Sequence, residues 1–229
     1  MLADPDVQTM SRRFMDVATA HICDALEHVG IRTPTLPDQF HPVTQVTKFA
    51  GRAVTLRLAF SRTGKEPRRL NELVEDAARP GSVVVIDALG KTGSTLFGDR
   101  AAFTAQRSGA VGAVVYGGCR DIDGLNDLRF PVHAIGRSLP ASEGKYQGLE
   151  INGDVVLEGV LIRAGDWLVA DESGICVVPQ EVADRVLILA EEREQIDRES
   201  MAGLRAGKTL REVHRHFKDD DVGMIGQTE

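Results

Sequence analysis

The side chains best suited to chemistry in this sequence are an aspartate and, after twenty intervening residues, an adjacent arginine and aspartate. Asp99 occurs in FGDRAAF, and Arg120 and Asp121 occur in GGCRDIDG. A guanidinium presents a planar fork of donors that matches a carboxylate. An aspartate offers the hard oxygen atoms that Mg²⁺ and Mn²⁺ prefer. These residue types predict a site for an anionic ligand and a divalent cation, with a helix N-cap and a surface ion pair as the simpler alternatives.

The elements around these residues predict that they lie together. The β-branched run VVVIDAL (83–89) indicates a buried strand, residues 99–109 indicate a helix, and AVGAVVY (110–116) indicates a second buried strand. A strand, a helix and a strand in this order form a βαβ unit with parallel strands. Because parallel strands end at the same edge of a sheet, Asp99 at the helix start should neighbour the Arg–Asp pair, beside the free N–H groups of the helix.

Patterns elsewhere predict a mixed fold with a βαβ core, an additional β layer and terminal helices. Short apolar runs broken by GD, EG, AGD and ESG over 151–179 indicate β-hairpins, and the charged stretch after residue 180 indicates a long helix. The GKTGSTLFG stretch (90–98) is expected to be a glycine-rich loop. The other predicted elements are a single helix over 7–30, a half-buried strand over 50–60, a helix over 67–79 and a short strand over 130–136.

Composition excludes several functional classes. The formal net charge of −7 argues against a general nucleic-acid binder and against an acidic membrane surface as a partner. Three cysteines without a CxxC pair fit a reducing compartment, and the charged N-terminus lacks the apolar core of a signal peptide. We therefore expect a cytoplasmic globular protein with no nucleic-acid and no membrane partner.

Three further motifs favour unremarkable roles. The GKT sequence at 90–92 fails as a phosphate loop because Val85 occupies the position that requires glycine. The histidines of HRH (214–216) point to different faces of a helix, which favours solvated side chains over a metal pair. Cys119 adjoins the Arg–Asp pair but has no histidine nearby in the sequence, which favours a partly buried thiol over a nucleophile.

With these motifs the chain resembles the divalent-metal-dependent pyruvate aldolases typified by 4-hydroxy-4-methyl-2-oxoglutarate/4-carboxy-4-hydroxy-2-oxoadipate aldolase. The non-catalytic relatives of that family are the regulators of ribonuclease activity A. The D-x20-R-D signature from Asp99 to Asp121 carries the resemblance. The other matching stretches, in chain order, are CDAL (23–26), FAGRAVTL (49–56), ARPGSVVVIDALG (78–90), GAVGAVVYGGCRD (109–121), FPVHAIG (130–136) and the segment 151–179.

The resemblance implies a compact α/β/β sandwich, similar to the swivelling domains, that forms homotrimers or homohexamers with active sites between subunits. Residues 1–185 would be the single catalytic domain, including the N-terminal helix. Residues 186–229 would be a C-terminal helical arm that packs on a neighbouring subunit. A glutamate of that arm would complete the outer shell of the metal in the neighbouring subunit, and of Glu192, Glu194 and Glu199 the last is preferred.

The resemblance also implies a role for each site residue. Asp121 would ligate the divalent cation, Mg²⁺ or Mn²⁺, directly, and Asp99 would hold it through a water molecule. Arg120 would bind the pyruvyl part of the substrate and, with Asp99, act in catalysis. The substrate-binding positions at the helix start would be Gly98, Arg100 and Ala101.

The implied activity is aldol cleavage of a 4-hydroxy-2-oxo acid to pyruvate and a second carbonyl compound, with oxaloacetate decarboxylation as a side activity. Both reactions pass through a pyruvate enolate whose charge a divalent cation stabilises. The alternative is a non-catalytic, protein-binding regulator, in which the aspartate that matches Asp99 is typically missing. A methyltransferase, a label that some relatives carry, has little support because no GxGxG turn follows the first strand.

Two departures from the family pattern concern the surroundings of the site. Many relatives continue R-D-x-x-E/D, whereas this chain has Asp123 one place early and Gly124 at the acidic position. The C-terminal region also lacks the GELGLD-like ending of the aromatic-pathway enzymes. These departures leave the outer support of the metal and the physiological substrate open.

Overall fold

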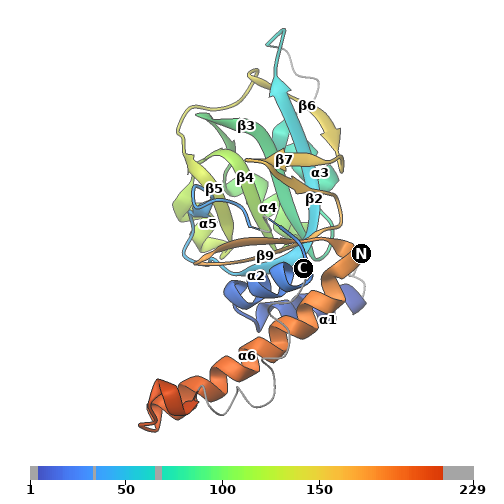
Figure 1. Ribbon diagram of the computed structural model, residues 1–229. Helices are drawn as coiled ribbons and strands as arrows, with labels where there is room; N and C mark the ends of the chain where they lie inside the picture. Colours follow the sequence, from blue (N-terminus) through green and yellow to red (C-terminus); the bar gives the residue numbers. More distant parts are fainter. Residues whose placement is uncertain (1–4, 33–34, 65–68, 214–229) are drawn as a thin grey trace.

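The computed structural model describes residues 5–32, 35–64 and 69–213 (Figure 1). The HRH motif lies outside these residues. Within them, eight strands form one mixed sheet in the order β1–β5–β4–β3–β2–β9–β10, and β6 pairs with β2. β7 and β8 form a separate hairpin. The strands are β1 (His41–Pro42), β2 (Phe49–Phe60), β3 (Ser82–Phe97), β4 (Gly112–Cys119), β5 (Val132–Arg137), β6 (Tyr146–Ile151), β7 (Val155–Leu157), β8 (Val160–Ile162), β9 (Trp167–Asp171) and β10 (Gly174–Val178).

The sheet is apolar on both faces because layers cover both. On one face Leu56, Ile86 and Val115 pack beneath the three short helices α3, α4 and α5. On the other face Val85 and Val114 pack against the β7–β8 hairpin and the β9–β10 pair. The structure therefore confirms the expected mixed α/β class, with a βαβ core and an additional β layer. The helices are α1 (Pro5–Met15), α2 (Thr19–His28), α3 (Leu70–Ala77), α4 (Asp99–Arg107), α5 (Ile122–Asp127), α6 (Ala183–Arg205) and the 3₁₀ helix η1 (Gln180–Val182).

The terminal helices form a third apolar cluster at one end of the sheet. Phe14 of α1 lies 5.3 Å from the Trp167 ring of β9, measured between ring centroids. α2 and the first part of α6 pack into the same cluster, and the rest of α6 extends away from the sheet (Figure 1). No helix in the described part of the chain is long and apolar enough to cross a membrane.

The prediction of a single N-terminal helix is wrong, because carboxylates from distant elements interrupt it between α1 and α2. Ala18 adopts an extended conformation, and its N–H donates to Glu194 of α6 at 3.1 Å. The N–H and the hydroxyl of Thr19 donate to the Asp171 carboxylate of β9 at 3.0 and 2.8 Å. These long-range hydrogen bonds satisfy donors at the start of α2 that an uninterrupted helix would have used internally.

Two strand predictions also need correction. The GKTGSTLFG stretch is not a loop but the second half of β3, which bends at Leu89 and Gly90, both with positive φ, and then continues to Phe97. The register with β4 shifts at this bend, as in a β-bulge. β2 is buried along most of its length rather than on one face only, and the Thr55 hydroxyl donates to the Gly153 carbonyl at 2.6 Å.

Candidate active site

The βαβ unit brings the predicted site residues to one edge of the sheet. β3 and β4 run parallel, and Phe97 pairs with Cys119 at their ends. One residue further along β4, the Arg120 N–H donates to the Phe97 carbonyl at 3.1 Å. α4 begins at Asp99, two residues after Phe97. The expected neighbourhood of Asp99 and the Arg–Asp pair therefore follows from the strand register.

The start of α4 presents Asp99 in its first turn. Gly98, not Asp99, occupies the N-cap position, so the simple N-cap alternative for Asp99 is wrong. The Asp99 carboxylate instead accepts the Arg100 N–H at 2.6 Å. The positive end of the helix dipole and the amides of this turn make the position favourable for an anion.

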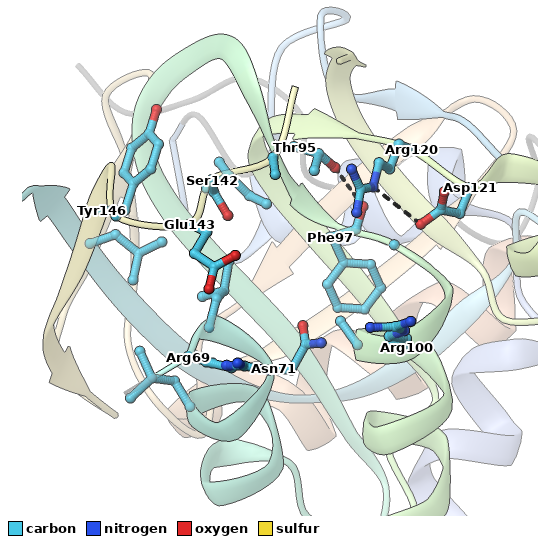
Figure 2. Close-up of a pocket in the computed structure, with 18 of the residues that line it drawn as sticks. Arg69, Asn71, Thr95, Phe97, Arg100, Arg120, Asp121, Ser142, Glu143 and Tyr146 are labelled. Carbon is cyan, nitrogen blue, oxygen red and sulfur yellow. Dashed lines mark hydrogen bonds and ion pairs between the residues drawn. The ribbon is translucent and has the colours of Figure 1, made fainter. Parts of the chain in front are cut away.

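A left-handed residue turns the Arg–Asp pair toward one ligand. Asp121 has φ 57° and ψ 41°, which supplies the bend that two adjacent side chains need to reach the same side. Arg120 Nε lies 3.3 Å from Asp121 Oδ2, and both side chains are 40% exposed. Arg120 also donates through Nη1 to the Leu139 carbonyl at 3.2 Å, and Figure 2 shows its guanidinium at the rim of the cleft.

Two glycines lie close to the two aspartates. A Cβ on Gly98 would lie 2.6 Å from Asp121 Oδ2. A Cβ on Gly124, in α5, would lie 2.9 Å from the Asp99 Cβ and 3.3 Å from its Oδ2. Real Cβ atoms essentially never come closer than 3.0 Å, so Gly124 is required for its packing on the Asp99 Cβ, whereas the flexible end of the Asp121 side chain could move away from a Cβ at position 98. The starts of α4 and α5 therefore lie against each other.

A cleft of about 820 Å³ opens beside these carboxylates. Phe97 forms part of its floor (Figure 2). Leu70 and Asn71 of α3 form part of one wall. The lining is mixed, with charged groups at both ends and apolar side chains between them. The predicted site residues that line it are Gly98, Asp99, Arg100, Ala101, Arg120 and Asp121.

The opposite wall was not predicted from the sequence. Residues 138–146, here called the wall loop, cross the cleft and end where β6 begins. The Thr95 N–H donates to the Pro140 carbonyl at 2.8 Å, and Lys145 Nζ donates to Ser94 Oγ at 3.0 Å. The small polar residues of SLPASEGKY indicate only a loop, and these long-range hydrogen bonds are what place it.

The glutamates proposed for a neighbouring subunit lie on α6 and do not line the described cleft of their own chain. Glu194 accepts hydrogen bonds from the Ala18 N–H and from Arg198 Nε at 3.1 and 3.0 Å. Glu199 accepts one from Gln195 at 2.6 Å on the exposed part of the helix. The role of Glu199 in another subunit remains a prediction.

Cys119 is fully buried, which is more than the partial burial expected from the sequence. Burial raises the pKa of its thiol to about 12, so the thiol stays protonated at neutral pH. Since the thiolate is the reactive form of cysteine, Cys119 is not a nucleophile.

The carboxylates of Asp99 and Asp121 fit a cation such as Mg²⁺ that also binds oxygen atoms of water and of a substrate. Among the described residues, no group of three or more histidine, cysteine, aspartate or glutamate side chains could enclose a metal ion. Mg²⁺ commonly binds through one or two carboxylates, with water and the substrate supplying the other oxygens. Asp121 and Asp99, which both line the cleft, provide two such carboxylates.

Comparisons with known proteins agree with this architecture. A family model described as "RraA-like: Aldolase/RraA" matches residues 19–177. A protein of Halalkalibacterium halodurans named "Putative 4-hydroxy-4-methyl-2-oxoglutarate aldolase" is 32% identical, over 81% of this chain and 83% of that protein. Protein DlpA of Legionella pneumophila is 25% identical over 95% of this chain, which spans only 35% of the length of DlpA.

Solved structures show the same fold. A protein of Pseudomonas syringae pv. tomato superposes with a TM-score of 0.81 and 28% identity, covering 93% of this chain and 98% of that one. RraAS2 of Streptomyces coelicolor, described as an unusual member of the RNase ES inhibitor RraA family, has a TM-score of 0.75 and 27% identity, with coverages of 88% and 98%. The chain belongs to the RraA-like, aldolase/RraA family.

Proposed function

We propose that this protein is a divalent-metal-dependent aldolase that cleaves a 4-hydroxy-2-oxo acid to pyruvate and a second carbonyl compound. The observation that carries the proposal is the meeting of Asp99 with Arg120 and Asp121 at one end of a cleft, beside the start of α4. The aldolase names of relatives at about 32% identity support it.

The chain's own groups bind and orient the pyruvyl part of the substrate. The Arg120 guanidinium, held by the Leu139 carbonyl, faces the carboxylate and the 2-oxo oxygen as a planar donor. The backbone of Gly98 and Ala101 at the start of α4 binds the same anionic end, whereas the Arg100 N–H already donates to the Asp99 carboxylate. These donors are already in place before the reaction, so they stabilise the negative charge of the enolate without reorganising.

Proton transfer falls to Asp99. The substrate's C4 hydroxyl loses a proton, the C3–C4 bond breaks, and the electron pair remains on C3 as the enolate of pyruvate. Asp99, acting through a water molecule, accepts the hydroxyl proton and returns a proton to C3. Asp121 would hold Mg²⁺ or Mn²⁺ directly and Asp99 would hold it through a water molecule, and such a cation would supply the Lewis acidity that favours the enolate.

The same arrangement supports oxaloacetate decarboxylation as a second activity. Loss of CO₂ from oxaloacetate leaves the electron pair on the carbon that becomes the methyl group of pyruvate. The enolate is therefore identical, and Arg120 stabilises it in the same way.

Assembly completes the proposed site. Residues 1–185 form the catalytic domain, and of the arm of residues 186–229 the part beyond Ala190, which is the last arm residue in the chain's own apolar cluster, packs on a neighbouring subunit of a homotrimer or homohexamer. Glu199 of that subunit would support the metal without binding it directly. The exposed outer part of α6, with Ile196 and Met201 on its surface, supports such packing.

The alternative is a protein-binding regulator without catalysis, since solved relatives carry the names of ribonuclease inhibitors. Pyruvate release with Mg²⁺ or Mn²⁺, with and without a chelator, separates the two functions. Several 4-hydroxy-2-oxo acids and oxaloacetate are the test compounds. The aldolase releases pyruvate only while the cation is present. Absent or chelator-insensitive release contradicts the aldolase and favours the regulator.

A further inference from the structure

The cleft extends well beyond the space that a pyruvyl group needs next to Arg120. At its far end two groups of opposite charge stand on facing walls, Arg69 at the start of α3 and Glu143 on the wall loop. Figure 2 shows Glu143 over the part of the cleft bounded by Arg69 and Asn71, on the side away from Asp121. We call Arg69, Asn71, Ser142 and Glu143 the distal subsite. None of them has a role in binding the pyruvyl end.

The position of Glu143 is set by a tightly anchored turn. The Lys145 N–H donates to the Ser142 carbonyl at 2.9 Å, which closes the turn around Glu143. The next residue, Gly144, packs on the chain at Gly64, where a Cβ on Gly144 would lie 2.9 Å from the Gly64 carbonyl oxygen. These contacts hold the backbone at Glu143, and its exposed side chain lines the cleft from this turn.

Arg69 is placed by the helix that follows it. Its backbone N–H donates to the Glu72 carboxylate at 3.2 Å, so residue 69 forms the N-cap of α3. Leu73 and Val74 anchor α3 on the sheet. Arg69 and Glu143 therefore come from two separately fixed elements.

The chemistry of the distal subsite is polar with no net charge. Its arginine and its glutamate cancel, while the amide of Asn71 and the hydroxyl of Ser142 both donate and accept hydrogen bonds. A second carboxylate on the substrate would be attracted by the Arg69 guanidinium and repelled by the Glu143 carboxylate. A chain of hydroxyl groups satisfies both, because each hydroxyl donates to the carboxylate and accepts from the guanidinium.

We propose that the distal subsite selects 4-hydroxy-2-oxo acids whose carbons beyond C4 carry hydroxyl groups and no charge. This specificity rests on the proposed function. Cleavage of the C3–C4 bond then yields pyruvate and a hydroxyaldehyde: the C4 hydroxyl proton is removed, C4 becomes the aldehyde carbon, and C3 takes up a proton. Glu143 is the specificity-determining residue, because it disfavours the substrates with two carboxylates that Arg69 alone would accept.

The experiment compares 4,5,6-trihydroxy-2-oxohexanoate with 4-hydroxy-2-oxoglutarate, a diacid, as substrates in the presence of Mg²⁺. We expect the wild-type kcat/KM for the trihydroxy acid to exceed that for the diacid by about tenfold or more. Glu143→Gln removes the negative charge and keeps the shape, so it should narrow the ratio to about unity, mostly through a lower KM for the diacid. Glu172→Gln, at an exposed carboxylate outside the cleft, is the matched control and should leave the ratio unchanged.

Each outcome decides something. A wild-type preference for the diacid, or a ratio that Glu143→Gln does not move, overturns the distal-subsite specificity while the aldolase stands. Pyruvate release from neither compound, nor from oxaloacetate, overturns the proposed function and the specificity with it. A preference for the trihydroxy acid that collapses in Glu143→Gln and persists in Glu172→Gln supports the specificity.

Discussion

Gly124 packs against Asp99 so closely that a Cβ at position 124 would lie 2.9 Å from the Asp99 Cβ. The missing side chain at position 124 lets α5 approach the start of α4. The position of Asp99 therefore depends on the absence of a side chain at residue 124.

Replacing this glycine should damage the site without damaging the fold. Gly124→Ala displaces Asp99, and a catalytic group misplaced by about 1 Å loses on the order of 10²-fold in rate. Alanine is the better helix former, so thermal stability should not fall through helix propensity. Steady-state pyruvate release and a thermal melt measure the two effects. Gly93→Ala is the control, since a Cβ there meets no atom within 4 Å, and a fully active Gly124→Ala enzyme would contradict the packing argument.

Asp121 is best tested with asparagine. Alanine at this left-handed position adds a backbone cost of about 1 kcal/mol, whereas asparagine tolerates the conformation and removes only the charge. Asp121→Asn should lower metal-dependent pyruvate release by about 10²-fold or more and weaken Mn²⁺ binding, read from the electron paramagnetic resonance signal of free Mn²⁺. Asp123→Asn, an exposed neighbour outside the cleft, should change neither, and substantial turnover in Asp121→Asn would rule out this site.

The three free thiols should differ in reactivity. Burial raises the pKa of Cys119 and of Cys176, and both side chains are inaccessible. Burial also raises the pKa of Cys23, but that side chain is partly exposed. A maleimide at pH 7.5 should modify Cys23 in the native protein and all three thiols after unfolding, as located by peptide mass spectrometry. Rapid labelling of native Cys119 would contradict its assignment as a buried, unreactive thiol.

Asp171 should make folding stability depend on pH. Burial opposes its ionisation, but hydrogen bonds from Thr19 and Ser173 outweigh burial and hold its pKa below the ordinary value. Its contribution is therefore present above the unfolded pKa of about 4 and is lost as the pH falls through the lower, folded pKa. Asp171→Asn should lose about 1 kcal/mol of the free energy of unfolding at pH 7, in line with helix capping.

Urea unfolding of wild type and Asp171→Asn between pH 7 and pH 3 measures this dependence. The difference between the two should shrink as the pH falls below about 4. Asp38→Asn changes an exposed carboxylate on the same end of the molecule and is the control. A difference that stays constant across the range would contradict the role of the charge.

The sequence allowed the convergence of Asp99 with Arg120 and Asp121 to be predicted because it follows from local patterns and one topological rule. Runs of β-branched residues mark β3 and β4, a helical stretch joins them, and parallel strands end at one edge. Asp99 and Arg120, which follow β3 and β4, were therefore expected to lie together at that edge. The left-handed conformation of Asp121, which bends the chain at this point, is not specified by the residue types.

The parts that escaped prediction are those that long-range hydrogen bonds determine. The break between α1 and α2 depends on Asp171, which lies more than 150 residues away from Thr19. The wall loop depends on Thr95 and Lys145, whose partners no periodicity reveals. Local sequence describes such segments only as turns or loops, because the groups that fix them belong to other elements.

The wall loop touches both ends of the cleft, through the Leu139 carbonyl on Arg120 and through Glu143 at the distal subsite. Pro140 and Lys145 tie the loop to β3, and Tyr146 at its end belongs to the core, whereas the side chains of residues 141–144 line the cleft. New substrate ranges can therefore arise by exchanging a few codons within 141–144, with the bond-breaking apparatus left intact.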